Sequence, residues 1–386
     1  MPPAELSRDW LNHASRELAA RAERELEALV AVSSPSGDAR AAEEICAVVT
    51  ALLPPTCDVE RPECSSPGHA PDLLATLRGT GDSRVLLLGH LDTVVSHAEH
   101  RPLEAMPERL IGSGAVDMKG GIALALGVMR ALADVPAAFA ELNLLAVNDE
   151  EWRTGGFAHL DRFAEHDACL CFEAGETDGD GNDAVVARRK AAGTLRVEAH
   201  GVAAHSGSAP ERGRNALLAL ADVAGRIAAV NDPAGPRRLT AVPTVIRAGE
   251  AFNVVPSGGE LVCDLRADDL DSFEPALAAV PPEVGGVELE AELVRQWPGM
   301  DTRAVAERLL APAGALLGRP VAAGERGGAS DASHMAERIA LTVDGLGPRG
   351  GRAHNPDEFV LRHSLLPRAE VALAVTAAAC GIIERS

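Results

Sequence analysis

The sequence predicts an α/β protein in which a domain built on a mostly parallel sheet is interrupted by a smaller, inserted α+β domain. Three observations lead to this prediction. The chain has 386 residues, more than one core usually holds, and 46% of them are hydrophobic. Short, continuously apolar runs alternate with helical patterns in its first half. From residue 190 to residue 292, apolar and polar residues alternate instead.

The first domain begins with helices and continues with strands that end in acidic or histidine residues. Residues 17–54 have a helical pattern that is broken at 33–38, where serine and aspartate offer caps for a second helix. The apolar runs VLLLGH, ELNLLAV and ACLC are each expected to form a strand buried on both faces. Helices are expected at 120–135 and 159–166. In such sheets, ligands bind beyond the carboxyl ends of the strands.

The segment 190–292 is expected to form a ferredoxin-like domain. Its predicted order is strand 193–201, helix 215–232, strands 240–250 and 253–267, helix 271–280 and strand 287–296. This β-α-β-β-α-β order is typical of that fold. Because a further strand–helix pattern follows it, we place an inserted domain at 190–295 within a first domain made of 1–189 and 296–386.

Charge and composition exclude several function classes. The chain has 36 basic and 57 acidic residues and a net charge of −21, which argues against a nucleic-acid partner. No apolar run approaches a membrane span, and the amino terminus lacks a signal-peptide pattern, so we expect a cytoplasmic protein. The 7 cysteines lack CxxC spacing, which indicates reduced thiols. Tyrosine is absent, so no phenol can act as an acid or as an oxyanion donor.

Five segments place Asp, Glu or His at chain turns where side chains can converge. They are GHLDTV (89–94), SGAVDMKGG (113–121), NDEE (148–151), CFEAG (171–175) and AHNPDE (353–358). No structural role needs this combination five times, whereas a pair of metal ions does. Two ions can activate a water molecule and hold the reacting oxygen. The sequence therefore predicts a metallohydrolase site, for which zinc suits the mixed ligands and cobalt or manganese are substitutes.

Each of these residues also has a plain structural interpretation. His90 with Asp92 is either a ligand whose second ring nitrogen is held by a carboxylate, or a core histidine beside a helix cap. Asp117 could bridge two ions or cap the helix that follows it. The acidic run 149–151 would repel itself after a buried strand unless cations neutralise it, although exposed acidic runs are usually solvated. Glu173 repeats this arrangement on the next strand.

Taken together, these segments resemble the M20 family of zinc-dependent amidohydrolases. That family includes glutamate carboxypeptidases, acetylornithine deacetylases, succinyl-diaminopimelate desuccinylases and aminoacylases. The match runs from about residue 86 to the carboxyl terminus. The resemblance implies two zinc ions per subunit, with these ligands: His90 and Glu173 for one ion, Glu151 and His354 for the other, and Asp117 between them. It also implies that Asp92 orients His90 and that Glu150 is the general base that activates a metal-bridging water.

By the same resemblance, the inserted domain is a lid and a dimerisation domain. HGVAAHSG (200–207) resembles the family's histidine motif, which implies that His205 stabilises the oxyanion in the partner subunit's active site. FNVVP (252–256) implies that Asn253 contacts the substrate. CDLRADD (263–269) implies that Arg266 binds a substrate carboxylate. Taken singly, these three are better explained as a surface histidine, a turn asparagine and a strand arginine, whereas together, in the family's order, they favour function. The resemblance also predicts a homodimer formed through this domain.

The predicted reaction is hydrolysis of an amide bond in a peptide or N-acyl amino acid with a free carboxylate, as in the glutamate carboxypeptidase branch. An N-acyl-amino-acid deacylase of a biosynthetic pathway shares every metal ligand and is the alternative. A non-catalytic metal-binding protein would have no need of Glu150. Segment 327–337 is expected to line the pocket, with Gly328 allowing close backbone approach and Ser330 offering a hydroxyl. The basic run 188–190 either recognises an acidic substrate or is solvated at a domain boundary.

Overall fold

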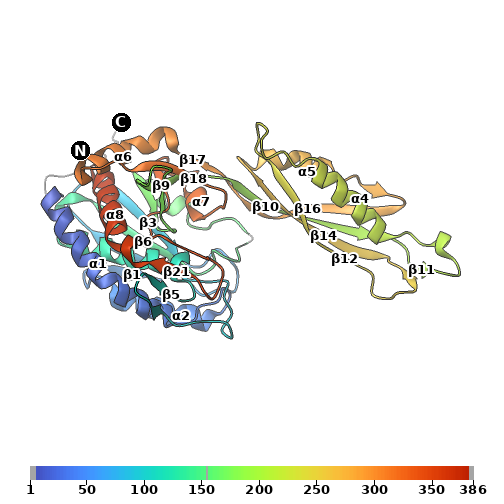
Figure 1. The fold of residues 1–386 in the computed structure, drawn as a ribbon, viewed down its shortest axis with the longest axis horizontal. Coiled ribbons are helices and arrows are strands. Elements are labelled where there is room, and N and C mark those ends of the chain that lie inside the picture. The colour runs from blue at the N-terminus through green and yellow to red at the C-terminus, as the bar shows by residue number, and fades with distance from the viewer. Residues whose placement is uncertain (1–5, 154, 382–386) are drawn as a thin grey trace. The chain divides into compact units, whose positions relative to one another are not determined.

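The structure is a computed structural model that describes residues 6–153 and 155–381. It divides into two compact units (Figure 1). Unit 1 contains Met1–Arg188, Asp301–Arg326 and Ser330–Ser386, and unit 2 contains Arg189–Met300 and Gly327–Ala329. Within the described part of the chain, every helix is too short or too polar to cross a membrane.

Unit 1 is built on a six-stranded, mostly parallel sheet, which confirms the predicted fold class. Its strands, in spatial order, are β1 (Asp58–Glu60), β2 (Leu73–Arg78), β6 (Glu141–Val147), β3 (Arg84–His90), β7 (Ala168–Cys171) and β19 (Thr342–Val343). Strands β6, β3, β7 and β19 are parallel, and β1 and β2 are antiparallel to their neighbours. Leu87 pairs with Leu144 on one side and Leu170 on the other. All three predicted apolar strands are therefore central and buried.

The helices of unit 1 are α1 (Arg8–Val30), α2 (Ala39–Leu52), α3 (Gly120–Ala133), α6 (Arg303–Leu317), α7 (Asp331–Met335) and α8 (Leu365–Cys380). Helices α1, α3 and α8 pack on one another, and α3 and α8 also contact β3. Helix α1 begins earlier than residue 17, where the sequence predicted it, because the Ser7 hydroxyl accepts the Trp10 N–H and caps its first turn. The predicted cap of the second helix is Asp38, which accepts the Ala41 N–H.

Unit 1 also contains strands of two smaller sheets. One has the order β17 (Met300–Asp301), β9 (Asp183–Arg189) and β18 (Ala322–Arg326), with β8 (Glu176–Thr177) paired to β9. The other has the order β20 (Gly350–Gly351), β21 (Phe359–Leu361), β5 (Arg109–Ile111) and β4 (Glu104–Ala105). The second of these sheets joins the chain before α3 to the loop that carries residues 353–358.

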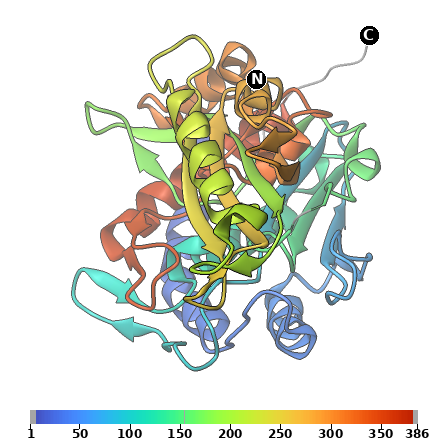
Figure 2. The same cartoon turned by 90° about the vertical axis from the view of Figure 1, so that its right-hand side faces the viewer.

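Unit 2 has the predicted ferredoxin-like order. Its antiparallel sheet contains, in spatial order, β12 (Thr240–Ala248), β14 (Gly258–Ala267), β10 (Ala191–His200), β16 (Val287–Trp297) and β15 (Glu283–Val284). Helix α4 (Ala216–Ala229) packs on this sheet (Figure 2), and α5 (Glu274–Ala278) is short. A separate ribbon pairs β11 (Ala204–His205) with β13 (Val254–Val255).

The prediction of a helix at 159–166 is wrong. The structure has only a short 3-10 turn there, Asp161–Phe163. The side chains at the two ends of this segment bond to the sheet instead: His159 Nε2 lies 2.8 Å from Asp72 Oδ2, and His166 Nε2 lies 2.7 Å from Asn143 Oδ1. An isolated helix of eight residues would be only marginally stable, so the hydrogen bonds to the sheet decide the conformation of segment 159–166.

Candidate metal centre

Three neighbouring parallel strands bring acidic and histidine residues to one edge of the central sheet. Strand β3 ends at His90, and β6 ends at Val147, directly before the acidic run 149–151. Strand β7 ends two residues before Glu173. Because β6, β3 and β7 are parallel and adjacent, their carboxyl ends meet at the same edge.

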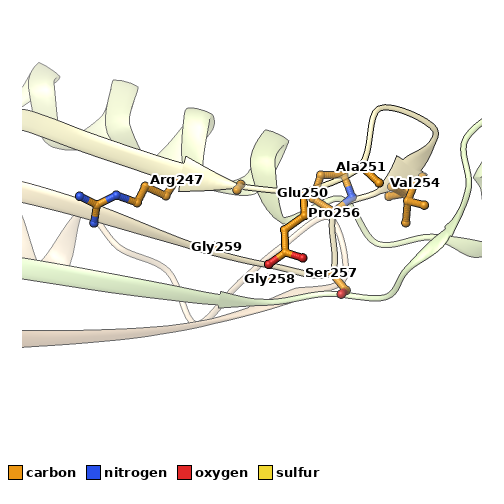
Figure 3. A pocket seen from close by; sticks show the side chains of 11 residues that line it. Arg247, Glu250, Ala251, Val254, Pro256, Ser257, Gly258 and Gly259 are labelled. Atoms are coloured by element: carbon orange, nitrogen blue, oxygen red, sulfur yellow. The ribbon is translucent and has the colours of Figure 1, made fainter.

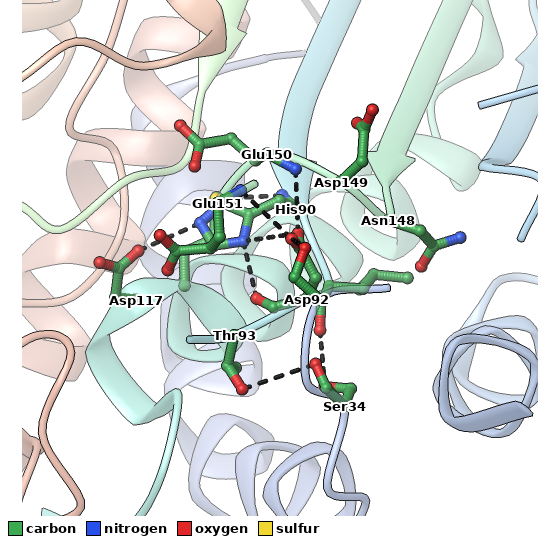
Figure 4. Close-up of polar contacts among 12 residues, drawn as sticks. Ser34, His90, Asp92, Thr93, Asp117, Asn148, Asp149, Glu150 and Glu151 are labelled. Carbon is green, nitrogen blue, oxygen red and sulfur yellow. Dashed lines mark hydrogen bonds and ion pairs between the residues drawn. The ribbon is translucent and has the colours of Figure 1, made fainter. Parts of the chain in front are cut away.

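The side chains at this edge form two groups that share Asp117. One group is His90, Asp117 and Glu173, and the other is Asp117, Glu151 and His354; within each group the ligand atoms lie within 4.8 Å of one another. His90 Nε2 lies 3.1 Å from Asp117 Oδ1 (Figure 4). It also lies 3.7 Å from Glu173 Oε1. His354 Nε2 lies 3.2 Å from Asp117 Oδ2 and 3.3 Å from Glu151 Oε2. Asp117 thus offers one oxygen to each group.

The electrostatics of both groups favour a cation. Hydrogen bonds to Asp117 and Glu151 raise the pKa of His354 to about 11. Burial by itself would lower the pKa of His90, but hydrogen bonds to Asp117 and Asp92 raise it well above its ordinary value. Both imidazoles therefore hold protons when no metal is bound. Two imidazole nitrogens among three carboxylates are ligands that suit zinc, and the donor set fits a pair of such ions.

Zinc binding to the metal-free protein is expected to release protons. An imidazole must be neutral to ligate, and the raised pKa of His354, about 11, keeps it protonated through neutral and mildly alkaline pH. The apparent zinc affinity should therefore rise with pH until that pKa is passed. Titration calorimetry in two buffers of different protonation enthalpy measures the number of protons released. Equal heats in both buffers would contradict the prediction.

Glu150 lies at this edge of the sheet without a partner for its carboxylate. It is 9% exposed, and its side chain makes no hydrogen bond or ion pair to any residue that the structure describes. Burial raises the pKa of Glu150 well above its ordinary value, and the carboxylates of Asp331, Glu151 and Glu173 act in the same direction against His90. Glu150 is thus a basic carboxylate that is not used within the fold.

Asp92 connects the histidine strand to the acidic run. His90 Nδ1 lies 3.0 Å from the Asp92 carbonyl oxygen and 3.4 Å from Asp92 Oδ1. The Asp92 carboxylate also accepts the backbone N–H groups of Glu150 and Glu151, each at 3.2 Å (Figure 4). Ser36 donates its hydroxyl to Asp92 Oδ2 at 2.7 Å. Loop 33–38, in which the sequence predicts only helix caps, therefore also supports Asp92 through Ser36.

Asp149 has a different partner from the other two acids of its run. The buried Arg153 donates to Asp149 Oδ1 from Nε at 3.1 Å and from Nη2 at 2.7 Å. Arg153 also donates from Nη2 to Asp331 Oδ2 at 3.1 Å, and from Nη1 to Asp331 Oδ1. An arginine therefore neutralises the first of the three successive carboxylates. Its position four residues after Asp149 was a signal in the sequence, whereas nothing local pointed to Asp331.

A third group of candidate ligands, Cys64, Asp72 and Asp149, also has ligand atoms within 4.8 Å of one another. Its two carboxylates already have partners: Asp72 accepts the Asn148 N–H at 2.8 Å and contacts His159, and Asp149 is bound by Arg153. A cation is not needed to balance them. The group is better explained as a polar network under the acidic run.

Three of the predicted residues lie in unit 2. His205 is exposed, and its Nδ1 accepts the N–H groups of Gly207 at 3.1 Å and Ser208 at 3.2 Å. Ser206, the residue after His205, donates its N–H to the Asn253 carbonyl oxygen at 3.0 Å. Arg266 donates from Nη2 to Asp264 Oδ1 at 2.9 Å, within the same strand. In unit 2, His205 thus ends β11, Asn253 directly precedes the paired strand β13, and Arg266 lies on β14.

The predicted pocket segment and the basic run are held by internal bonds. The Ser330 hydroxyl donates to Asp344 Oδ2 at 2.6 Å and is buried. The Gly328 carbonyl oxygen accepts Arg189 Nη1 at 2.7 Å, and Lys190 Nζ donates to the Arg238 carbonyl oxygen at 2.8 Å. Arg189 is only 5% exposed, so this part of the basic run is not a solvated surface.

Unit 2 also has a hollow, whose lining residues come from the chain on both sides of Asn253. It is lined by the end of β12, the start of β14 and the chain between them, including Arg247, Glu250 and Pro256, as Figure 3 shows. None of the predicted site residues lines it. It contains a single basic and a single acidic side chain and offers no group of metal ligands.

Comparison with known proteins gives one family match and several relatives. A family model described as peptidase family M20/M25/M40 matches residues 86–378. Carboxypeptidase G2 from Pseudomonas sp. (strain RS-16) is 25% identical over 313 residues, which cover 77% of this chain and 74% of that protein. Succinyl-diaminopimelate desuccinylase from Methylobacterium sp. (strain 4-46) is 30% identical over 343 residues, which cover 78% of this chain and 82% of that protein.

Solved structures share the fold. Aminopeptidase PepT from Bacillus cereus ATCC 10987 has a TM-score of 0.73 at 20% identity, and the match covers 94% of this chain and 98% of that one. An M20 family metallo-carboxypeptidase, Sso-CP2 from Sulfolobus solfataricus, has a TM-score of 0.71 at 15% identity, with 92% and 98% covered. At these identities the likeness establishes the architecture and not the substrate.

Proposed function

Because the chain belongs to peptidase family M20/M25/M40, we propose that it is a di-zinc hydrolase that cleaves an amide bond in a peptide or N-acyl amino acid with a free carboxylate. The observation that supports this most directly is the pair of ligand groups that share Asp117. The free carboxylate of Glu150 next to them supports catalysis over mere metal binding, because a binding protein has no use for a base there.

The proposed ligands divide between the two ions as the two groups do. His90 and Glu173 would hold one zinc ion, Glu151 and His354 would hold the other, and Asp117, which belongs to both groups, would be their shared ligand. When bound, the ions supply charge that lowers the pKa of a water molecule and polarises the scissile carbonyl. Cobalt or manganese can replace zinc at ligands of this kind.

Glu150 moves the proton in the proposed reaction. Its carboxylate takes a proton from the attacking water and later delivers it to the leaving amine nitrogen. The raised pKa of Glu150, caused first by burial, makes the carboxylate a stronger base for the first step. The Asp92 carboxylate holds the backbone of Glu150, and Ser36 in turn holds Asp92.

Unit 2 is the proposed lid, and it supplies groups that bind the substrate. His205 is suited to donate a hydrogen bond to the oxyanion, because its Nδ1 accepts two backbone N–H groups and its proton then lies on Nε2. Arg266 is proposed to bind the substrate carboxylate and Asn253 a second polar group of the substrate. For Arg266 this requires that the substrate replace Asp264 as its partner.

A homodimer through unit 2 is part of the proposal. Strand β12 is an edge of its sheet and exposes Val242 and Ile246. Helix α4 exposes Leu217 and Leu218, the latter to 64%. An open strand edge beside an apolar helix face suits pairing with a second copy of the chain.

The reaction is tested with a panel of amides on the zinc-loaded protein. We expect release of glutamate or another amino acid from dipeptides and N-acyl amino acids, as the likeness to carboxypeptidase G2 suggests. The desuccinylase relative at 30% identity favours a second candidate, an N-acyl-amino-acid deacylase. N-succinyl substrates in the panel separate the two. No turnover of any of these amides would contradict the proposed function.

Mixing two inactive variants is expected to restore activity if His205 acts in the partner's site. The Glu150→Gln and His205→Ala variants are mixed with each other and allowed to exchange subunits. Every mixed dimer then has one site with both residues intact, so about one quarter of the original activity returns. Each variant alone, put through the same exchange, is the control. If His205 acts within its own subunit, the mixture stays inactive, and a fully active monomer would overturn the dimer itself.

A further inference from the structure

We propose that Glu358 is a positioning residue that locks the loop of Asp117 to the loop of His354. This inference rests on the proposed metal site, in which those two residues are ligands. Glu358 is the last residue of the segment 353–358 and has no role in the site as described so far.

The Glu358 carboxylate is buried, at 1% exposure, and it accepts three backbone N–H groups of a single loop. Oε1 accepts from Val116 at 2.5 Å and from Asp117 at 2.7 Å, and Oε2 accepts from Gly114 at 3.3 Å. The Glu358 carbonyl oxygen also accepts the Gly112 N–H, at 2.9 Å. One residue thus binds four N–H groups of the chain between 112 and 117.

These N–H groups depend on Glu358 because the loop is not part of a regular strand. Gly114 has a φ of +73°, which turns the chain and aims successive N–H groups to one side. Buried backbone N–H groups need an acceptor, and a carboxylate that accepts several of them holds the loop firmly. The position of the Asp117 backbone is therefore fixed from outside its own loop.

The same residue fixes His354 through a short turn. The Glu358 N–H donates to the Asn355 carbonyl oxygen at 2.9 Å, and the Asp357 N–H donates to Asn355 Oδ1 at 2.9 Å. His354 Nε2 contacts Asp117 Oδ2 at 3.2 Å. The contacts form a closed ring: from the Asp117 side chain to His354, along the turn to Glu358, and back to the Asp117 N–H. Breaking the hydrogen bonds of the Glu358 carboxylate should therefore move Asp117 away from His354, which are two of the proposed ligands.

Zinc affinity of two conservative variants tests the proposal. Glu358→Gln keeps the reach of Oε1, which accepts from Val116 and Asp117, and loses only the longest contact, to Gly114. Glu358→Asp keeps the charge but shortens the side chain by one methylene, so the carboxylate no longer reaches the loop. We expect zinc affinity, measured by competition with a chelator, to fall about 10–100-fold in Glu358→Asp and less in Glu358→Gln.

Glu25→Asp is the matched control. Glu25 is also a buried glutamate of unit 1, and it accepts Arg130 Nη2 at 2.6 Å without contacting a proposed ligand. It should lose stability without losing zinc affinity, and circular dichroism shows whether each variant is folded.

Three results would overturn the inference or its premise in distinguishable ways. If folded Glu358→Asp binds two zinc ions as tightly as the unchanged protein, Glu358 does not position the ligands. If Glu358→Gln is weakened more than Glu358→Asp, the charge matters rather than the reach, and the positioning role is wrong. If the unchanged protein binds no zinc, the proposed metal site itself fails.

Discussion

Replacing Glu150 with glutamine is expected to lower kcat by about 10²–10⁴-fold while the protein keeps its zinc. Glutamine has nearly the same shape, but its amide cannot take a proton from water. The Glu150 side chain is bound to no described residue, so the substitution should not disturb the ligands. Steady-state kinetics measure the loss, and elemental analysis measures the zinc content.

The neighbouring residue provides the control for this prediction. Glu151 lies 3.3 Å from His354 Nε2 and belongs to a ligand group, so Glu151→Gln should lose zinc as well as activity. The same substitution at adjacent positions thus separates the base from the ligand. If Glu150→Gln keeps its activity, the proposed role of Glu150 is wrong.

Replacing Asp117 with alanine is expected to abolish both metal sites at once. Asp117 is the only residue common to the two ligand groups, and its two oxygens face the two histidines separately. Zinc content should fall from two ions per chain to less than one. Activity should fall at least about 10³-fold, because the ions stabilise the charge that develops in the transition state by several kcal/mol.

His354→Ala is the comparison for Asp117→Ala. His354 belongs to one group only, so the variant should keep the ion held by His90 and Glu173 and lose the other. Zinc content measured after gel filtration distinguishes the two outcomes. An Asp117→Ala protein that retains two zinc ions would contradict a shared ligand at this position.

Local patterns predicted the elements on which the site is built. The apolar run before His90 forms β3, the run before Asn148 forms β6, and the glycine-led pattern after Asp117 forms α3. Each pattern is decided within a few residues, by burial on both faces of a strand or by helical spacing. The error at 159–166 has the opposite cause, because bonds to the sheet from His159 and His166 outweigh a weak local preference.

The residues that support the site were less accessible to sequence reasoning. Ser36 was interpreted as part of a helix-capping loop, and it holds Asp92. Arg153 is only two residues from the acidic run in the sequence, but its second partner, Asp331, lies in a distant segment of the chain. In the sequence, Glu358 is simply the last acid of the segment 353–358 that contains His354. In each case the missing information was the partner, which belongs to a distant part of the sequence.

The sequence by itself determined the α/β class, the inserted ferredoxin-like unit and the kinds of side chain that are available for metal chemistry. Those properties follow from periodicity, from turns and from residue type, all of which are local. Only the tertiary structure decided that His90, Glu173, Glu151 and His354 meet around Asp117, and that Arg153 neutralises Asp149 instead. Parallel strands align their carboxyl ends only when the sheet is complete, so which distant side chains meet is a property of the folded chain.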